Sequence, residues 1–264
     1  MQKNDSAALE KWFKKHPPVS PAAVLKHAEL LMAKKEWERA VPMLYNLWAK
    51  GELSDEESEL VRETLLNGRK AKQAKKLLSA VDDEAKKLAT VRIGLIENAA
   101  HADRKIKDLP AEQRKNAGLL FDELRWLRNK GKYADAAKLL KSVPPSVQSG
   151  ERWWNERVTV ARQMLNDNRA ADAYALVKNH ALAAGGGAYA DAEWLAGWIA
   201  LRDLKKTKLA RAHFANMLDA VKSPVSIARG EYWTGRAFEA ARNKSEARKW
   251  YQKSAEHITT IYGQ

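Results

Sequence analysis

The residues that decide the fold lie near the C-terminus, at positions 235–251, which read GRAFEAARNKSEARKWY. Small and large side chains alternate there at offsets of 0, 3, 12 and 16: Gly235, Phe238, Ala247 and Tyr251. Residues three or four positions apart share one face of a helix, and the polar segment 242–244 between the two pairs predicts a turn. The stretch therefore predicts two antiparallel helices, in which small residues allow close approach and large ones fill the groove.

The same spacing recurs along the chain and is typical of the tetratricopeptide repeat (TPR). Three units share the spacing without a gap: Ala28, Leu31, Ala40 and Leu44; Ala161, Met164, Ala173 and Val177; and Leu124, Leu127, Ala136 and Leu140, in which Leu124 is larger than the pattern requires. Two looser matches are Gly197, Ala210 and Phe214, with one extra residue in the turn, and Leu65, Ala74 and Leu78, with Arg62 in place of a small residue. These repeats predict an all-α, TPR-like helical-hairpin superhelix, an α-solenoid of U or ring shape. The alternative is an irregular helical bundle.

Proline and glycine mark the expected organisation. We expect an N-terminal extension over residues 1–20 and a superhelical repeat domain over 21–264, with a possible weak boundary at 144–150, where prolines interrupt the helical pattern. Pro21 suits the first turn of a helix, and Ser223-Pro224 marks another break. Residues 83–98 should form a further helix in the long gap between repeats.

Composition narrows the possible partners. The chain of 264 residues has no cysteine, which excludes disulfides and thiolate metal sites, and no apolar run approaches the roughly 20 residues of a membrane span. The segment from Met1 to His16 lacks the apolar centre of a signal peptide. The net charge of +14 favours a polyanionic partner, although it can also serve solubility alone. The ten tryptophans favour core packing over a sugar-binding groove.

Motifs that carry chemistry are not found. The six histidines do not stand at a helical ligand spacing: His16, His27, His101, His180, His213 and His257. The glycines at 185–187 lack the lysine of a phosphate loop and predict a linker, and the acidic run at 55–63 predicts a solvated helix face. We therefore expect no catalytic, cofactor-binding or metal-binding residue and no cofactor.

The C-terminal half carries sharper motifs. They are Arg152-Trp153-Trp154-Asn155-Glu156-Arg157, the stretch from Asp191 to Leu201, the stretch from Ser223 to Ala237, and Thr259-Thr260-Ile261-Tyr262-Gly263-Gln264. This succession resembles the superhelical, U-shaped domain of soluble lytic murein transglycosylases over about residues 150–264. Over residues 1–150 the resemblance is only general.

The resemblance implies a parent enzyme in the periplasm, a lyase that cleaves peptidoglycan and forms 1,6-anhydromuramic acid. This chain would be the non-catalytic domain that supports the lysozyme-like catalytic domain and helps to bind murein. Its partners would be peptidoglycan and the missing linker and catalytic domains, with no nucleic acid and no membrane span. Glu57-Ser58 lacks the context of the family's catalytic glutamate, so the chain alone should be inactive.

Two other functions stay open on the sequence. One is a free-standing TPR-like adaptor that binds a protein or peptide in its concave face. The other is a nucleic-acid-binding solenoid, favoured by the basic run at 69–76 but without a recognised motif. What is encoded after Gln264 separates the first interpretation from these two. The sequence does not identify the residues that contact a ligand.

Overall fold

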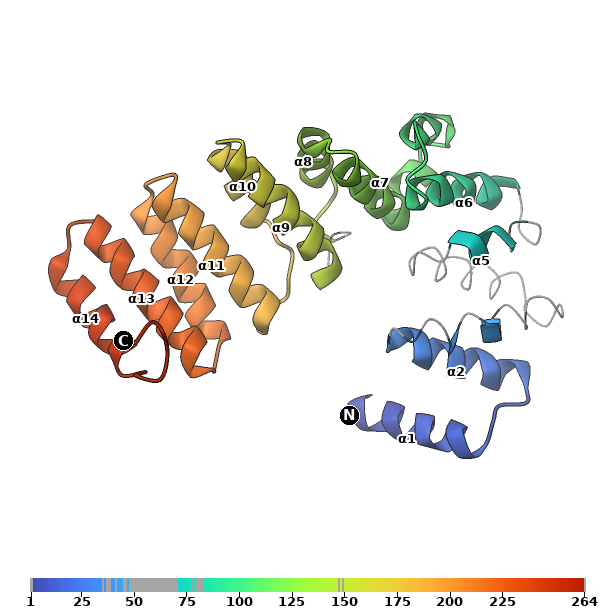
Figure 1. Cartoon of the computed structure of the whole chain (residues 1–264), viewed down its shortest axis with the longest axis horizontal. Coiled ribbons are helices and arrows are strands. Elements are labelled where there is room, and N and C mark those ends of the chain that lie inside the picture. The colour runs from blue at the N-terminus through green and yellow to red at the C-terminus, as the bar shows by residue number, and fades with distance from the viewer. Residues whose placement is uncertain are drawn as a thin grey trace. The chain divides into compact units, whose positions relative to one another are not determined.

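The computed structural model describes residues 2–34, 36, 39–40, 42–44, 47, 71–76, 78, 83–146, 148 and 150–263 (Figure 1). These residues form helices, turns and loops, and no strand occurs among them. The elements are α1 (Gln2–Lys15), α2 (Pro21–Ala33), α5 (Ala71–Lys76), α6 (Asp83–Ile96), the 3-10 helices η2 (Ala102–Asp108) and η3 (Gln113–Lys115), α7 (Ala117–Asn129), α8 (Tyr133–Ser142), α9 (Glu151–Asn166), α10 (Ala170–Val177), α11 (Gly187–Arg202), α12 (Thr207–Ala220), α13 (Pro224–Ala240) and α14 (Lys244–Ala255). No described helix is both long enough and apolar enough to cross a bilayer.

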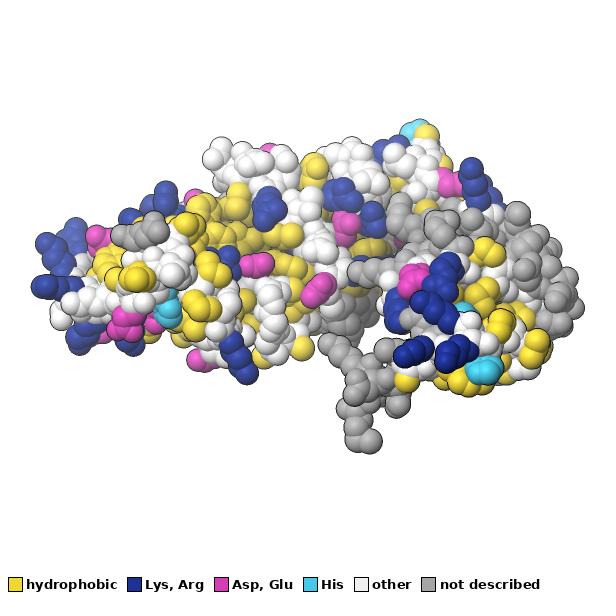
Figure 2. Space-filling model, turned by 60° about the horizontal axis from the view of Figure 1, so that its bottom comes forward, with side chains coloured by type: hydrophobic (Ala, Val, Ile, Leu, Met, Phe, Trp, Pro, Cys, Tyr) yellow, Lys and Arg dark blue, Asp and Glu magenta, His cyan; other side chains and the backbone are white. Residues whose placement is uncertain are grey.

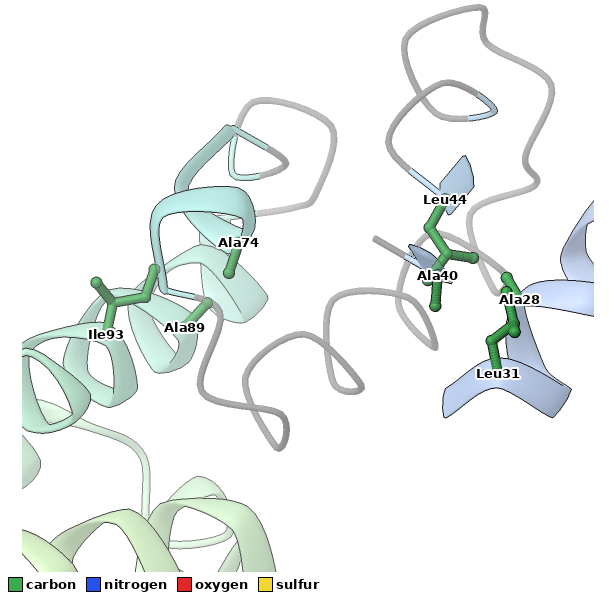
Figure 3. Packing of buried hydrophobic residues seen from close by; sticks show 7 residues of the cluster. All are labelled: Ala28, Leu31, Ala40, Leu44, Ala74, Ala89 and Ile93. Carbon is green, nitrogen blue, oxygen red and sulfur yellow. The ribbon is translucent and has the colours of Figure 1, made fainter. Parts of the chain in front are cut away.

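The chain divides into two compact units, Met1–Trp126 and Leu127–Gln264. In the first unit, a hydrophobic cluster gathers residues from separate helices, as Figure 3 shows: Ala28, Leu31, Ala40, Leu44, Ala74, Ala89 and Ile93. Phe13 of α1 stacks on the ring of His27 of α2 at 4.5 Å between centroids. The first predicted hairpin therefore buries its small and large positions together.

A buried ion pair also holds the first unit together. Arg92 of α6 donates from Nε to Asp122 of α7 at 2.8 Å, and both side chains are inaccessible to solvent. Gly118 makes room for the guanidinium, because a Cβ at that position would lie 2.5 Å from it. A buried charge of this kind is tolerated only when a partner compensates it.

Three helical hairpins follow one another in the second unit: α9 with α10, α11 with α12, and α13 with α14 (Figure 1). The small-and-large spacing is confirmed by their packing. A Cβ on Gly235 would lie 2.6 Å from the ring of Tyr251, and one on Gly197 would lie 2.5 Å from the ring of Phe214. The glycines thus admit the aromatic side chain of the partner helix, and the predicted all-α, TPR-like hairpin fold is confirmed.

Two serine-proline pairs begin helices. Ser20 precedes Pro21 at the start of α2, and its hydroxyl accepts from the backbone N–H of Ala23 at 3.3 Å. Ser223 caps α13 in the same way, with Pro224 as the first helical residue. Proline is suited to this position because the first helical N–H groups have no intrahelical acceptor.

Several predicted features lie outside the described residues. They are the acidic run at 55–63 with Glu57-Ser58, the positions Arg62 and Leu65, and the first residues of the basic run at 69–76. From that basic run, α5 is described, and its Ala74 is fully buried. The predicted domain limits at 20 and at 144–150 stay predictions.

Candidate functional site

The first helices of the three C-terminal hairpins form one continuous layer. Helix α9 packs against α11, and α11 packs against α13, whereas α10 and α12 each pack against the first helix of the next hairpin. In stacked hairpin repeats the layer with the closer spacing lines the inner side of the curve. We call the exposed surface of α9, α11 and α13 the first-helix face.

Aromatic rings run along this face. Trp194 lies between Trp198, at 6.5 Å between ring centroids, and Trp233, at 6.1 Å and an interplanar angle of 75°. Tyr232 continues the row, with its ring 5.7 Å from that of Trp233. All four rings are half-buried, in contrast to Trp153 and Trp154, which are core residues. Trp194 and Trp233 also pack against the hydrophobic cluster that contains Phe214, so the aromatic row is joined to the core and only partly accessible.

Arginine side chains lie against this row. The guanidinium of Arg202 is 5.8 Å from the ring centroid of Trp198, and that of Arg229 is 5.1 Å from Trp194. These distances fall within the range of cation–π attraction. Figure 2 shows hydrophobic side chains among Lys and Arg side chains over the C-terminal unit, on the left of the view.

A pocket of about 710 Å³ opens between α9 and α11, and we call it the α9–α11 pocket. It is lined by Arg162, Leu165, Asn166, Asn168, Ala170, Trp198, Arg202, Asp203 and Lys205. Its volume lies within the usual range of ligand sites. The combination of cations, amides and one indole suits a ligand that has both anionic and apolar groups.

The three cations of this pocket are available for a ligand. Within the described part of the chain, no carboxylate lies within 4.0 Å of the charged atoms of Arg162, Arg202 or Lys205. By contrast, Arg229 on the same face pairs with Asp191 at 2.8 Å, and Arg236 pairs with Glu239 at 3.1 Å. The α9–α11 pocket therefore contains positive charge that no carboxylate of the described residues neutralises.

A hydrogen-bonded network lies beneath the aromatic row and joins three helices. Glu193 of α11 accepts from His180 Nε2 at 3.1 Å through Oε1, and from His213 Nδ1 at 2.6 Å through Oε2. Asn216 of α12 donates to Oε2 at 3.2 Å. Tyr174 of α10 lies 2.9 Å from His213 Nε2. The network ties α10 and α12 to α11, one residue before Trp194.

The partners of each ring nitrogen set the protonation pattern. The backbone N–H of Leu182 donates to His180 Nδ1 at 3.0 Å, so His180 donates to Glu193 from Nε2. His213 donates to Glu193 from Nδ1, and its Nε2 exchanges a hydrogen bond with the Tyr174 hydroxyl. Burial raises the pKa of Tyr174, and the nearby charge of Glu193 adds to this effect, so the phenol stays protonated.

The carboxylate at the centre is ionised. Burial acts to raise the pKa of Glu193, but the hydrogen bonds from His180, His213 and Asn216, with the charge interaction with His213, together outweigh it and lower the pKa to about 2. Both carboxylate oxygens of Glu193 and both ring nitrogens of His180 and His213 have partners, so the network acts as a structural tie between the helices. Glu193 and His180 are buried, Tyr174 and His213 are half-buried, and Asn216 is exposed. No group of three or more His, Cys, Asp or Glu suited to a metal ion occurs among the described residues.

This network was not predicted from the sequence. His180 and His213 were considered there only as metal ligands, and Glu193 was not singled out. A signal was present, because Glu193 precedes Gly197 by four positions and therefore shares its buried face. A carboxylate on a buried helix face requires partners.

Comparisons with known proteins give similarity in structure only. No protein-family model matches the chain, and no curated protein matches it. Solved structures that resemble it include MamA, at 17% identity over 68% of this chain and 96% of that chain with a TM-score of 0.39. Others are the APC/C hetero-tetramer Cut9-Hcn1, at 13% identity over 97% and 50% with a TM-score of 0.43, and the human IFIT1 dimer with PPP-AAAA, at 14% identity over 96% and 78% with a TM-score of 0.34.

The predicted membership of the lytic transglycosylases is wrong, and so are the peptidoglycan and cell-wall assignments that depend on it. No family model supports it, and the similar structures named above are helical-repeat proteins of other kinds. The motifs behind it have packing roles that any helical-hairpin protein needs: Trp153 and Trp154 are core residues, Ser223 caps α13, and Gly235 admits Tyr251. The periplasmic location depended on that resemblance and stays a prediction.

Proposed function

We propose that this protein is an interaction scaffold that binds extended segments of partner proteins on its first-helix face. The observation that carries the proposal is the half-buried aromatic row of α11 and α13, which ends at an open pocket with unpaired cations. Large aromatic and arginine side chains supply most of the binding energy in protein interfaces.

The Glu193 network beneath the first-helix face favours binding, because it keeps the aromatic side chains of the row in one arrangement. The Glu193 network fixes α11 against α10 and α12, and the row itself lies on helices. A surface that is ordered before the partner arrives loses less conformational entropy on binding.

Charge on the face favours a polypeptide over nucleic acid. Carboxylates of Asp191, Asp203 and Glu239 are exposed there, close to the cations. A run of phosphates along the aromatic row would meet these carboxylates, whereas a polypeptide can place cationic, apolar and anionic side chains in turn. Nucleic-acid interfaces are, in addition, much more uniformly positive.

The test is site-specific photo-crosslinking in cells that make the protein. A photoreactive phenylalanine analogue in place of Trp198 should give covalent adducts that protease removes and nuclease does not. The matched control places the same analogue at Lys208, an exposed position of α12 outside the first-helix face. The proposal fails if position 198 gives no adduct, gives a nuclease-sensitive one, or gives the same adducts as position 208.

A further inference from the structure

We propose that the α9–α11 pocket binds an acidic peptide segment, with its carboxylates beside Arg162 and Arg202 and an apolar side chain against Trp198. This inference rests on the proposed function and specifies the chemistry of the partner. The occupant is a polypeptide rich in aspartate or glutamate.

The lining of the pocket defines an anionic occupant. Three cations, Arg162, Arg202 and Lys205, face one carboxylate, that of Asp203. None of the three cations has an ion-pair partner in the described part of the chain. Guanidinium groups bind carboxylates through two parallel hydrogen bonds, which adds geometric selectivity to the attraction.

The apolar and amide groups define the rest of the ligand. Trp198 is half-buried and Leu165 lies beside it in the pocket, so an apolar side chain of the ligand has a surface to cover. Asn166 and Asn168 are exposed at the same rim, and a side-chain amide can both donate to and accept from an extended peptide backbone. A free inorganic anion would use none of these groups.

Two other pockets of the C-terminal unit provide contrasts. The pocket of about 420 Å³ at the start of α11 and α13 contains Asp191 and Arg229, which already neutralise each other at 2.8 Å. The pocket of about 760 Å³ at the end of α13 and along α14 has the cations Arg242, Lys244 and Arg248 and the carboxylate of Glu239, but its aromatic residue is Tyr251 and it contains no indole. It provides a matched control, because the same number of arginines can be removed there without touching the α9–α11 pocket.

The experiment selects ligands from a random peptide library displayed on phage, with the full chain as bait. We expect enriched peptides to combine several Asp or Glu residues with an aromatic or aliphatic residue. A fluorescein-labelled synthetic copy of the most enriched peptide is then titrated by fluorescence anisotropy. The double variant Arg162→Gln/Arg202→Gln should weaken its binding about tenfold, since two exposed charge pairs are lost. The control Arg242→Gln/Arg248→Gln should change it less than about twofold.

The outcomes separate this inference from the proposed function. Enriched peptides without Asp or Glu, whose binding is still lost on Trp198→Ala, overturn the acidic ligand and leave the scaffold role standing. If both double variants weaken peptide binding equally, the inference is also overturned, because the peptide would then be attracted by the overall positive charge and not by the α9–α11 pocket. No enriched peptide, together with no crosslink from position 198, overturns both. Displacement of the bound peptide by a short single-stranded DNA at equal concentration overturns the peptide in favour of nucleic acid.

Discussion

Replacing Glu193 with glutamine is expected to destabilise the C-terminal unit, because the network that joins α10, α11 and α12 depends on a charged acceptor. Both carboxylate oxygens of Glu193 accept hydrogen bonds from histidine nitrogens, at 3.1 and 2.6 Å. An amide offers one acceptor in place of two. His180 cannot adapt, because Leu182 N–H occupies its Nδ1. Only His213 can change tautomer, accept from the new amide and donate to Tyr174.

The expected loss in the free energy of unfolding is about 2–3 kcal/mol. Hydrogen bonds to charged groups contribute roughly 1.5–3 kcal/mol each, and the change of tautomer recovers part of the loss. The pKa of Glu193 expresses the same interactions in a second way. Its fall from 4.5 to about 2 on folding corresponds to about 3 kcal/mol, at roughly 1.36 kcal/mol for each pKa unit. Glu193 is buried, so this value needs little reduction for solvent screening.

The same pKa difference fixes how the effect depends on pH. The folded pKa of Glu193 lies below the unfolded one, so the ionised carboxylate stabilises the fold. Its contribution is complete above pH 4.5 and is lost as the pH falls from 4.5 toward 2. Glutamine does not titrate, so the difference in stability between the variant and the original chain should shrink over that interval.

Urea unfolding followed by tryptophan fluorescence, near pH 7 and near pH 3, measures both quantities. The control is Glu246→Gln on α14, which removes an exposed ion pair with Lys249 and should cost no more than about 0.5 kcal/mol. A loss below about 0.5 kcal/mol for Glu193→Gln near pH 7, or a loss of the same size at both pH values, would refute the reasoning.

Three further changes test the packing. Gly197→Ala should lower the free energy of unfolding by about 1–3 kcal/mol, because its Cβ would lie 2.5 Å from Phe214. In urea unfolding, Gly197→Ala should cost less in a Phe214→Leu background, where the clash is relieved. If the free-energy changes of the two substitutions simply add, the close contact is contradicted. Asp122→Ala should lower the free energy of unfolding by about 3–5 kcal/mol, because it removes the carboxylate that pairs with the buried Arg92. An unchanged midpoint of thermal unfolding would contradict the importance of that pair. Ser254→Ala removes the hydroxyl proton that is shared between the carbonyls of Ala228 and Tyr262, and it should speed amide hydrogen exchange after α14. Unchanged exchange would contradict this role.

The fold could be predicted from the sequence where packing repeats. Gly235 and Tyr251 meet as their spacing requires, and Ala161, Met164 and Val177 are fully buried at their predicted positions. The region between α6 and α7 could not be predicted in this way. It consists of short 3-10 helices preceded by His101 in a left-handed conformation, at a φ of 56°. Such segments have no apolar period, because their backbone is set by local turns.

The site was harder to predict because it depends on contacts between hairpins. His180 follows α10 and His213 lies on α12, 13 and 20 residues from Glu193 in sequence. No spacing within one helix joins them, and only the stacking of successive hairpins brings them together. The aromatic row has the same origin, because Trp194 and Trp233 belong to different hairpins.

The net charge did not identify the ligand site, because contacts between hairpins also decide which charges are paired. A total of +14 does not distinguish a cation that is already paired from one that is available to a ligand. Within the C-terminal unit, Arg128 pairs with Glu156 and Lys141 with Asp172, so these charges hold neighbouring helices together. The cations of the α9–α11 pocket make no such pair, and they lie in the same pocket as the half-buried indole of Trp198. Selectivity for a partner therefore depends on which charges folding leaves unpaired, and that distribution is a property of the hairpin stack.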